Sequence, residues 1–317
     1  MSITIAIHGG AGTIRQSEIT PEMAAERHEG LRRALRAGWT VLKAGGTALD
    51  AVTKAVMALE EDPLFNAAHG AVMTEAGTME MDAAIMNGED RSAGAVAAIC
   101  GPRHPVLAAR AVMETTPHVL MIGEAAMAVA RNAGLTFEPA SWFETPERRA
   151  ALERELARRA ANAPDTRSDA DRHGTVGAVA RDINGHLAAA TSTGGLTGKR
   201  VGRVGDTPVF GAGTFADDAS CAVSCTGTGE VFIRFTAASE IAARLRYKGE
   251  SLDVAAQDVV TELAGKGGDG GLIALAAQGD PTLPFNAAGM YRGWADAQGR
   301  LHTAIYREPF TVVEGLG

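Results

Sequence analysis

Aromatic side chains and positive charge are both scarce in this sequence. Only 5 % of the 317 residues are Phe, Trp or Tyr, and 38 acidic residues outnumber 30 Lys and Arg, which gives a formal net charge of −8. Proteins that bind nucleic acid usually present a basic stripe to the phosphates. The composition therefore argues against nucleic acid as a partner.

Cysteine is nearly absent. The three residues, Cys100, Cys221 and Cys225, form neither an even framework nor a Cys-x-x-Cys pair. This excludes a disulfide-stapled secreted domain. Cys221 and Cys225 are four apart in a strand-like run, which predicts that they share one face of a strand and are buried as small hydrophobes.

Long apolar runs are missing too. No window approaches the ~20 apolar residues that cross a membrane, and residues 1–8 lack the basic and apolar regions of a signal peptide. We therefore expect a cytoplasmic protein without a membrane segment. The apolar fraction of 46 % is too high for a disordered chain, and 38 glycines exceed the usual share of ~7 %. Small residues in such number predict closely packed elements and many turns.

Periodicity and turn signals divide the chain into blocks of strands and blocks of helices. Apolar residues at helical spacing predict helices over 21–43, 47–61, 105–115, 123–131, 236–248 and 252–264, and a charged helix that begins near 144 and breaks before 171. Strands are predicted over 3–7, 71–74, 79–87, 93–100, 175–182, 186–193, 209–211, 219–226, 230–235, 272–278, 287–293 and 302–307. Asn184-Gly185 between two apolar runs indicates a hairpin. The block order favours an α+β fold, a four-layer αββα sandwich of two mainly antiparallel sheets.

A glycine-threonine pair lies where the polar stretch before it meets a buried strand. At Gly174-Thr175 the glycine lets the backbone adopt a strained geometry, and the Thr175 hydroxyl could attack the preceding carbonyl. Hydrolysis of the resulting ester would leave Thr175 as an N-terminus whose α-amine, of unperturbed pKa ~7.7–8.0, serves as the base. Alone, this dipeptide is a weak signal, because Gly-Thr pairs are common.

Three further clusters strengthen that interpretation. Thr191-Ser192-Thr193 places hydroxyls at the end of the second hairpin strand, and Thr226 to Gly229 ends another strand with a hydroxyl and bare backbone N–H groups, the parts of an oxyanion hole. Between them, the Arg203 guanidinium suits a carboxylate and the Asp206 carboxylate suits an ammonium. Together, the latter two residues would recognise an α-amino acid.

At this point the sequence resembles the plant-type L-asparaginase/isoaspartyl peptidase family of N-terminal-nucleophile hydrolases, and the bacterial isoaspartyl peptidases in particular. The resemblance extends over nearly the whole chain. It is carried by the segments HGGAGTI at 8–14, LEEDPLFNAAHGAVMT at 59–74, residues 105–126, HGTVGAVARDINGHLAAATSTGGLTGKRVGRVGD at 173–206, GAG at 211–213, VSCTGTGEVFIR at 223–234 and LPFNAAGMYRGW at 283–294.

The resemblance implies a single domain that cleaves itself between Gly174 and Thr175. The products would be an α subunit, 1–174, ending in a flexible linker from about 162, and a β subunit, 175–317, with two such αβ units forming a heterotetramer. The mature enzyme would hydrolyse L-asparagine and β-aspartyl dipeptides to release L-aspartate, with no cofactor for catalysis.

The same resemblance implies individual roles for site residues. Thr175 would be the nucleophile, Thr193 would orient it with help from Thr191, and Thr226 with the N–H of Gly227 would form the oxyanion hole. Arg203 would hold the substrate carboxylate, and Asp206 the ammonium, assisted by the backbone of Gly229. The supporting residues would be Asn66 near the nucleophile and the turn His8-Gly9-Gly10 behind the scissile bond.

The loop from 59 to 69 resembles the sodium-binding loop of that family. Its implied ligands are the backbone carbonyls of Leu59, Glu60, Asp62, Phe65, Ala67 and His69, and oxygen donors suit a hard cation. This chain departs from the family's Phe-Asn-Ala-Gly at one position, where Ala68 replaces the glycine. If the position needs positive φ, alanine would be strained by ~1–2 kcal/mol.

Three other functions are weighed against this one. Glycosylasparaginase shares the fold, but the sequence follows the peptidase pattern more closely and carries no signal peptide; assaying a glycosylated asparagine beside β-aspartyl-leucine separates the two. A nucleotide-binding protein would use glycine loops such as 8–12 and 227–229, but neither completes a phosphate-binding motif. A member that never matures and only binds ligands would give one intact mass in place of two.

Overall fold

The computed structural model describes residues 2–12, 14–163 and 174–314. Several of its helices begin where a short polar side chain caps them. Thr20 accepts a hydrogen bond from the third residue of α1 (Pro21–Lys43), Thr47 does the same for α2 (Ala48–Glu60), and Ser251 for α10 (Leu252–Ala264). The predicted bounds of α1 and α10 are therefore confirmed, since their signals are local.

The other elements alternate in blocks. The remaining helices are α3 (Pro105–Thr115), α4 (Gly123–Asn132), α5 (Ala140–Phe143), α6 (Pro146–Ala160), α8 (Gly229–Phe235) and α9 (Ala237–Ala243), with a 3-10 turn at Gln16–Glu18 and a π-helical turn at Arg244–Lys248. The strands are β1 (Thr4–Gly12), β2 (Met81–Asn87), β3 (Ala93–Ile99), β4 (Leu120–Ile122), β5 (Val176–Arg181), β6 (Leu187–Thr193), β7 (Thr214–Ala216), β8 (Cys221–Gly227), β9 (Gly270–Ala276), β10 (Gly289–Ala295), β11 (Leu301–Ala304) and β12 (Thr311–Val313).

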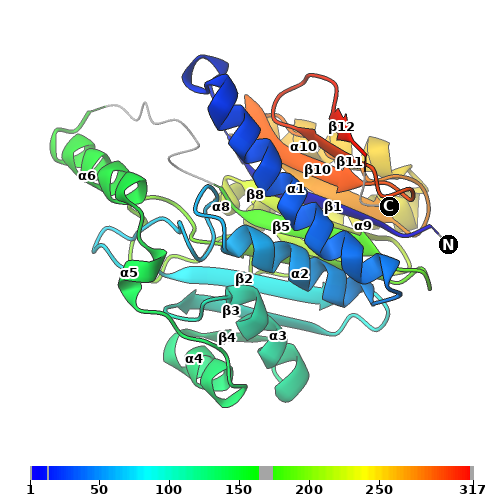
Figure 1. Cartoon of the computed structure of the whole chain (residues 1–317), viewed down its shortest axis with the longest axis horizontal. Helices are drawn as coiled ribbons and strands as arrows, with labels where there is room; N and C mark the ends of the chain where they lie inside the picture. The colour runs from blue at the N-terminus through cyan, green and yellow to red at the C-terminus, as the bar shows by residue number, and fades with distance from the viewer. Residues whose placement is uncertain (1, 13, 164–173, 315–317) are drawn as a thin grey trace.

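The strands form two sheets that pack face to face. The larger sheet has the order β12-β11-β10-β1-β5-β6-β2-β3-β4, and the smaller has the order β7-β8-β9. Helices α1, α2 and α3 cover one face of the large sheet, as Figure 1 shows for α1 and α2, while β8 and β9 contact β1, β5 and β6. Helices α9 and α10 cover the small sheet. The predicted αββα sandwich is confirmed.

The predicted hairpin is also confirmed. Strands β5 and β6 pair antiparallel, with Val176 opposite Ser192 and Arg181 opposite Leu187, and Gly185 in the turn has φ +90°. The start of β5 therefore lies beside the end of β6 at one edge of the sheet. Cys221 and Cys225 lie on β8 and are both fully buried, as expected.

Three strand predictions are wrong. Residues 230–235 form helix α8, because the N–H groups of Val231 and Phe232 turn back to the carbonyl of Thr228; their β-branched and aromatic side chains suggested a strand that the backbone does not form. Residues 209–211 form a turn, and strand β7 begins at Thr214. Residues 71–74 form a loop rather than a strand, because the Val72 N–H donates its hydrogen bond to the Asn66 Oδ1 instead of to a neighbouring strand.

Short elements with weak sequence signals were not predicted. These are β4, β12 and α5, of three or four residues each. In the part of the chain that the structure describes, no helix is both long enough and apolar enough to cross a membrane. The predicted linker from about 162 lies largely outside the described residues.

Helix α3 packs so closely on β3 that Gly94 admits no side chain. A Cβ there would lie 2.1 Å from the Ala109 carbonyl oxygen in α3. We expect Gly94→Ala to lower the free energy of unfolding by about 1–3 kcal/mol, because the helix must shift away. Gly265→Ala is the control, since its Cβ would meet its nearest atom at 3.5 Å. Urea unfolding measures both, and equal stabilities would contradict the packing argument.

Candidate active site

Thr175 lies directly before β5, and its hydroxyl is paired. Its Oγ1 donates a hydrogen bond to Oγ1 of Thr193, at the end of β6, over 3.1 Å. The Thr193 oxygen also accepts the N–H of Gly195 at 2.9 Å. Thr175 is only 7 % exposed. The hairpin register thus brings the two predicted threonines together and fixes the direction of the Thr175 hydroxyl.

The peptide before Thr175 runs through a narrow space. A Cβ on Gly10, whose φ is +110°, would lie 2.7 Å from the Gly174 Cα, and a Cβ on Gly174 would lie 2.8 Å from the Asn66 Cβ. Asn66 is held in turn, because its amide donates to the Gly195 carbonyl and accepts the Val72 N–H. Glycine at 10 and 174 is therefore required for this approach. His173 lies outside the described residues.

A fully buried imidazole holds Thr175 from behind. His8 in β1 places Nδ1 3.0 Å from the Thr175 carbonyl oxygen and Nε2 2.8 Å from the Ser224 Oγ. Burial lowers the pKa of His8 to about 3, so the ring is neutral. Because a carbonyl only accepts, Nδ1 carries the proton and Nε2 accepts from the Ser224 hydroxyl.

Behind His8 the hydrogen bonds continue between the sheets. Ser224 of β8 lies 2.7 Å from the Thr191 hydroxyl, which also accepts from Thr214 over 2.7 Å. Thr191, expected as a helper of the nucleophile, is linked to Thr175 among the described residues through Ser224 and His8. A Cβ on Gly177 would lie 2.0 Å from the Ser224 Oγ, so glycine there lets the two strands approach.

The predicted oxyanion residues end β8. Thr226 is fully buried, and its hydroxyl accepts the N–H of Ala11 at 3.3 Å. Gly227 has φ +150°, and a Cβ on it would lie 2.3 Å from the Asp269 carbonyl oxygen. Ala11 follows Gly10, which abuts Gly174. The end of β8 is therefore tied to the segment that presses on the Gly174-Thr175 peptide.

Two oppositely charged side chains, those of Arg203 and Asp206, converge at Gly229, the position that the family resemblance associates with them. A Cβ on Gly229 would lie 2.8 Å from the Asp206 Oδ1 and 3.0 Å from the Arg203 Nη2. Burial raises the pKa of Asp206 to about 7, and its Oδ2 has no hydrogen-bond partner among the described residues. Arg203 is engaged by Glu230, with both bonds at 2.9 Å. The site therefore presents the Arg203 guanidinium, paired with a carboxylate that a ligand could replace, and the Asp206 carboxylate, one of whose oxygens lacks a hydrogen-bond partner among the described residues.

Residues that sequence reasoning missed support this loop. Asp82 of β2, which is fully buried, accepts the N–H groups of Ala98 and Gly205. Glu80 accepts the N–H of Gly202 and, through its carbonyl, the Lys199 ammonium at 2.6 Å. The sequence did carry a signal for Asp82, because a lone carboxylate within an apolar strand is unusual and indicates a buried hydrogen-bonding role. The sequence carried no comparable signal for Ser224 or Glu230. The contacts of Ser224 depend on the register of β8, and those of Glu230 depend on the folding of its segment as helix α8.

The loop at 59–69 offers backbone oxygens. The carbonyls of Glu60 and Asp62 accept N–H groups of His69 and Phe65 within it, and each retains a second lone pair. Ala68 has φ +44°, so this position does take the conformation that glycine prefers. Among the described residues, no three His, Cys, Asp or Glu side chains gather as metal ligands. Carbonyl oxygens are donors that hard cations prefer.

Comparison with known proteins agrees with this geometry. A family model described as asparaginase matches residues 1–305. The isoaspartyl peptidase of Salmonella typhimurium is 51 % identical over 312 residues, covering 96 % of this chain and 98 % of that protein. That of Escherichia coli K12 is 50 % identical over 308 residues, covering 96 % of each. The isoaspartyl peptidase/L-asparaginase of Rattus norvegicus is 41 % identical over 307 residues, covering 96 % of this chain and 89 % of that protein.

The buried Asp206 should destabilise the fold when it is ionised. Because its folded pKa is raised from 3.8 to about 7, the folded state binds the proton more tightly than the unfolded state, and stability falls as pH rises from 4 to 7. We expect Asp206→Asn to be more stable than the parent at pH 8, by up to roughly 4 kcal/mol, and the difference to shrink towards pH 4.

Urea unfolding at pH 5 and pH 8 measures this difference. Asp253→Asn, at an exposed position on α10, is the control and should not show it. An Asp206→Asn protein that gains no stability at pH 8 would contradict the assignment of a costly buried carboxylate.

Proposed function

The chain belongs to the asparaginase family, and on that premise we propose that it acts through Thr175 on L-asparagine and β-aspartyl dipeptides. It is a hydrolase, and the threonine-nucleophile type follows from the family. The observation that carries the assignment of the nucleophile is the Thr175 hydroxyl, paired with Thr193 beside the compressed Gly174 peptide. Small amino-acid substrates fit the Arg203–Asp206 pair.

The first reaction is maturation of the chain itself. The Thr175 Oγ attacks the Gly174 carbonyl carbon, and the acyl group moves from nitrogen to oxygen. Water hydrolyses the ester, leaving 1–174 and 175–317 with a free α-amine on Thr175. The hydrogen bond from neutral His8 to the Thr175 carbonyl supports this step, because it fixes the residue on the far side of the scissile bond.

Catalysis then uses the same atoms. The α-amine takes the Oγ proton as Oγ attacks the β-carbonyl of the substrate, and passes the proton to the departing amine. Thr226 and the N–H of Gly227 would stabilise the oxyanion, a contribution worth about 3–4 kcal/mol per donor elsewhere. Water releases L-aspartate from the acyl-enzyme. Arg203 would hold the α-carboxylate, and Asp206 the α-ammonium that gives its Oδ2 a partner.

Three finer assignments belong to the same proposal. A sodium ion bound by the 59–69 carbonyls would stiffen the loop that carries Asn66, and the carbonyl donor set supports it. Free Cys100, Cys221 and Cys225 support residence in a reducing compartment, the cytoplasm. Pairing of two αβ units into a heterotetramer rests on the family resemblance.

Self-cleavage is tested by removing the nucleophile. Purified parent protein should show two bands on denaturing electrophoresis, whereas Thr175→Ala should give one inactive chain of 32.8 kDa. Thr175→Ser keeps a hydroxyl and should still cleave. Intact-mass spectrometry places the break between Gly174 and Thr175. Full L-asparaginase activity in an uncleaved Thr175→Ala protein would refute the mechanism.

Glu230 competes with substrate for the Arg203 guanidinium. The pair is partly exposed, with Glu230 56 % exposed, and such pairs contribute about 0.2–1 kcal/mol. We expect Glu230→Gln to lower KM for L-asparagine by roughly two- to fivefold with little change in kcat. Glu240→Gln is the control, because it removes a similar pair between Glu240 of α9 and Arg244 in the turn that follows. A rise in KM would instead show that Glu230 contacts the substrate ammonium.

A further inference from the structure

A buried ammonium lies in the loop 194–206, the loop that carries Arg203 and Asp206. Lys199 is only 2 % exposed, and its Nζ donates a hydrogen bond of 2.6 Å to the backbone carbonyl of Glu80. A charged group costs free energy when it leaves water, unless an opposite charge nearby compensates for it. The steps of the proposed reaction make no use of this cation, so its charge needs another explanation.

Lys199 and Arg203 approach each other at one glycine. A Cβ on Gly195 would lie 3.0 Å from the Lys199 Nζ and 3.4 Å from the Arg203 Nη1. The two positive groups therefore face the same small space, where they repel each other. Such an arrangement is stable only if a negative charge lies close to both.

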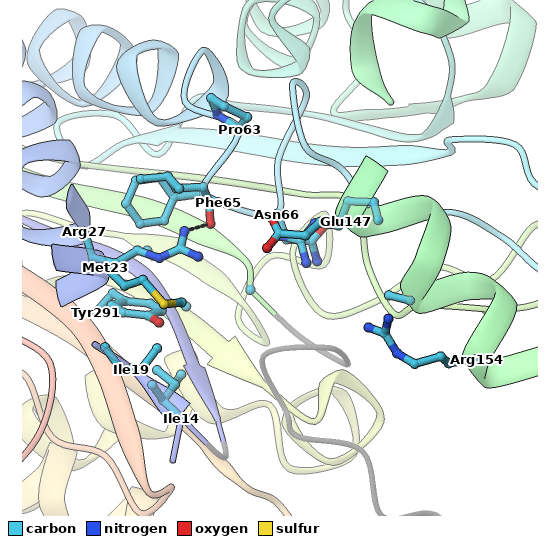
Figure 2. A pocket seen from close by; sticks show the side chains of 17 residues that line it. Ile14, Ile19, Met23, Arg27, Pro63, Phe65, Asn66, Glu147, Arg154 and Tyr291 are labelled. Atoms are coloured by element: carbon cyan, nitrogen blue, oxygen red, sulfur yellow. Dashed lines mark hydrogen bonds between the residues drawn. The ribbon is translucent and has the colours of Figure 1, made fainter. Parts of the chain in front are cut away.

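The backbone at this point is fixed on the side of the nucleophile as well. The Gly195 N–H donates to the Thr193 Oγ1, and the Gly195 carbonyl accepts a hydrogen bond of 2.8 Å from the Asn66 amide. Figure 2 shows Asn66 in the wall of the cavity beside Gly174. Gly195 therefore cannot move away from the two cations without disturbing the hydrogen bonds around Thr193.

The anion that acts on both cations is Asp82 of β2. Its carboxylate is fully buried and accepts the N–H groups of Ala98 and Gly205 at 2.9 and 3.3 Å. Burial raises the pKa of Asp82 and lowers the pKa of Lys199, and in each case the charge of the other residue is the strongest opposing influence. The Arg203 charge acts on Asp82 in the same direction, but more weakly. Lys199 is therefore the main counter-charge of Asp82.

Only one backbone segment separates Asp82 from Arg203. The Gly205 N–H points to the Asp82 Oδ2, and a Cβ on Gly205 would lie 2.9 Å from the Arg203 Nη1. On its other side, Arg203 is held by Glu230, which is 56 % exposed. Arg203 thus lies between a buried carboxylate and an exposed one, and attraction over a given distance is stronger in the interior than in water. Without Lys199, Asp82 would draw the guanidinium inwards.

We propose that Lys199 is a positioning residue whose charge balances that of Asp82, so that the Arg203 guanidinium stays available to the α-carboxylate of the substrate. The proposal rests on the proposed function, in which Arg203 holds that carboxylate. Lys199 acts through Arg203 and does not itself touch the substrate. It therefore determines how tightly the enzyme binds substrates with a free α-carboxylate, and it takes no part in the bond-breaking steps.

Two neutral substitutions separate the charge of Lys199 from its hydrogen bond. Lys199→Gln removes the charge but keeps an N–H for the Glu80 carbonyl, whereas Lys199→Met removes both. We expect each to raise KM for L-asparagine about tenfold and to change kcat less than about twofold, because both lose the charge. Arg200→Met is the matched control, since it removes an exposed cation from the next position and should leave KM unchanged. Self-cleavage into two chains shows that each variant has folded.

A second substitution distinguishes charge balance from a loosened loop. Asp82→Asn removes the negative charge and keeps an oxygen for the Ala98 N–H. The double variant Lys199→Gln/Asp82→Asn should return KM for L-asparagine to within about threefold of the parent value, because no buried anion then attracts Arg203. A loop that Lys199→Gln had merely loosened would gain nothing from the loss of a further hydrogen-bond acceptor.

The outcomes decide between these explanations. A parental KM in Lys199→Gln would overturn the proposal, and so would a double variant that binds L-asparagine no better than Lys199→Gln. A fall in kcat at constant KM, or a Lys199→Gln chain that stays uncleaved, would also overturn it, since Lys199 would then act on Thr175 through Gly195. All of these results leave the proposed function intact, whereas a mature parent protein that does not hydrolyse L-asparagine would refute the proposed function itself.

Discussion

The hydrogen bond between His8 and the Thr175 carbonyl is the interaction on which the arrangement of the site depends. It crosses from β1 to the start of β5, in the sheet layer that faces β8, and the second ring nitrogen of His8 lies against the Ser224 hydroxyl of β8. Complete burial keeps the ring neutral across the physiological pH range. Burial in turn requires the two sheets to meet without a gap at Gly177, where any side chain would collide with Ser224. The orientation of the nucleophile therefore depends on the packing of the two sheets. A change that separates β5 from β8 would also disrupt the hydrogen bonds that hold Thr175 in place.

Charge is distributed in the site according to exposure. Asp206 is buried and short of a partner, so the fold holds it at a cost that a bound ammonium would relieve. Arg203 is held by the more exposed Glu230, a pairing that water and salt weaken. Asp82 fixes the loop between them through the Gly205 N–H. In the proposed function, affinity for a zwitterionic amino acid would come from replacing the weak Arg203–Glu230 pair and from giving the Asp206 Oδ2 a partner, and a loop fixed before binding would avoid the entropy cost of assembling both groups.

Features of the fold and the site that depend on neighbouring residues could be predicted from the sequence, whereas features that depend on contacts between distant segments could not. The capped helices and the Asn184-Gly185 hairpin follow from neighbouring residues, and the hairpin alone brings Thr175 and Thr193 to one edge. Thr226, Arg203 and Asp206 could be proposed because each ends a strand or occupies a turn beside glycine. Ser224 and Glu230 could not, because the register of β8 against the large sheet and the fold of 229–235 as a helix decide where they point. The apolar spacing of Val231 to Phe235 fits a strand as well as a short helix, and only the turn of backbone at Thr228 distinguishes them.

Ala68 shows why a departure from a family pattern need not change the loop that contains it. Its φ of +44° is the left-handed conformation, which costs an alanine about 1–2 kcal/mol. The side chain is fully buried within the core beneath the large sheet, and burying one methyl group contributes about 0.8 kcal/mol. Alanine also avoids the extra chain entropy, about 0.5–1 kcal/mol, that a glycine loses on folding. The two contributions offset most of the strain, so the loop that carries Asn66 keeps its shape with alanine in place. The cation loop of the proposed function would therefore not require a glycine at position 68.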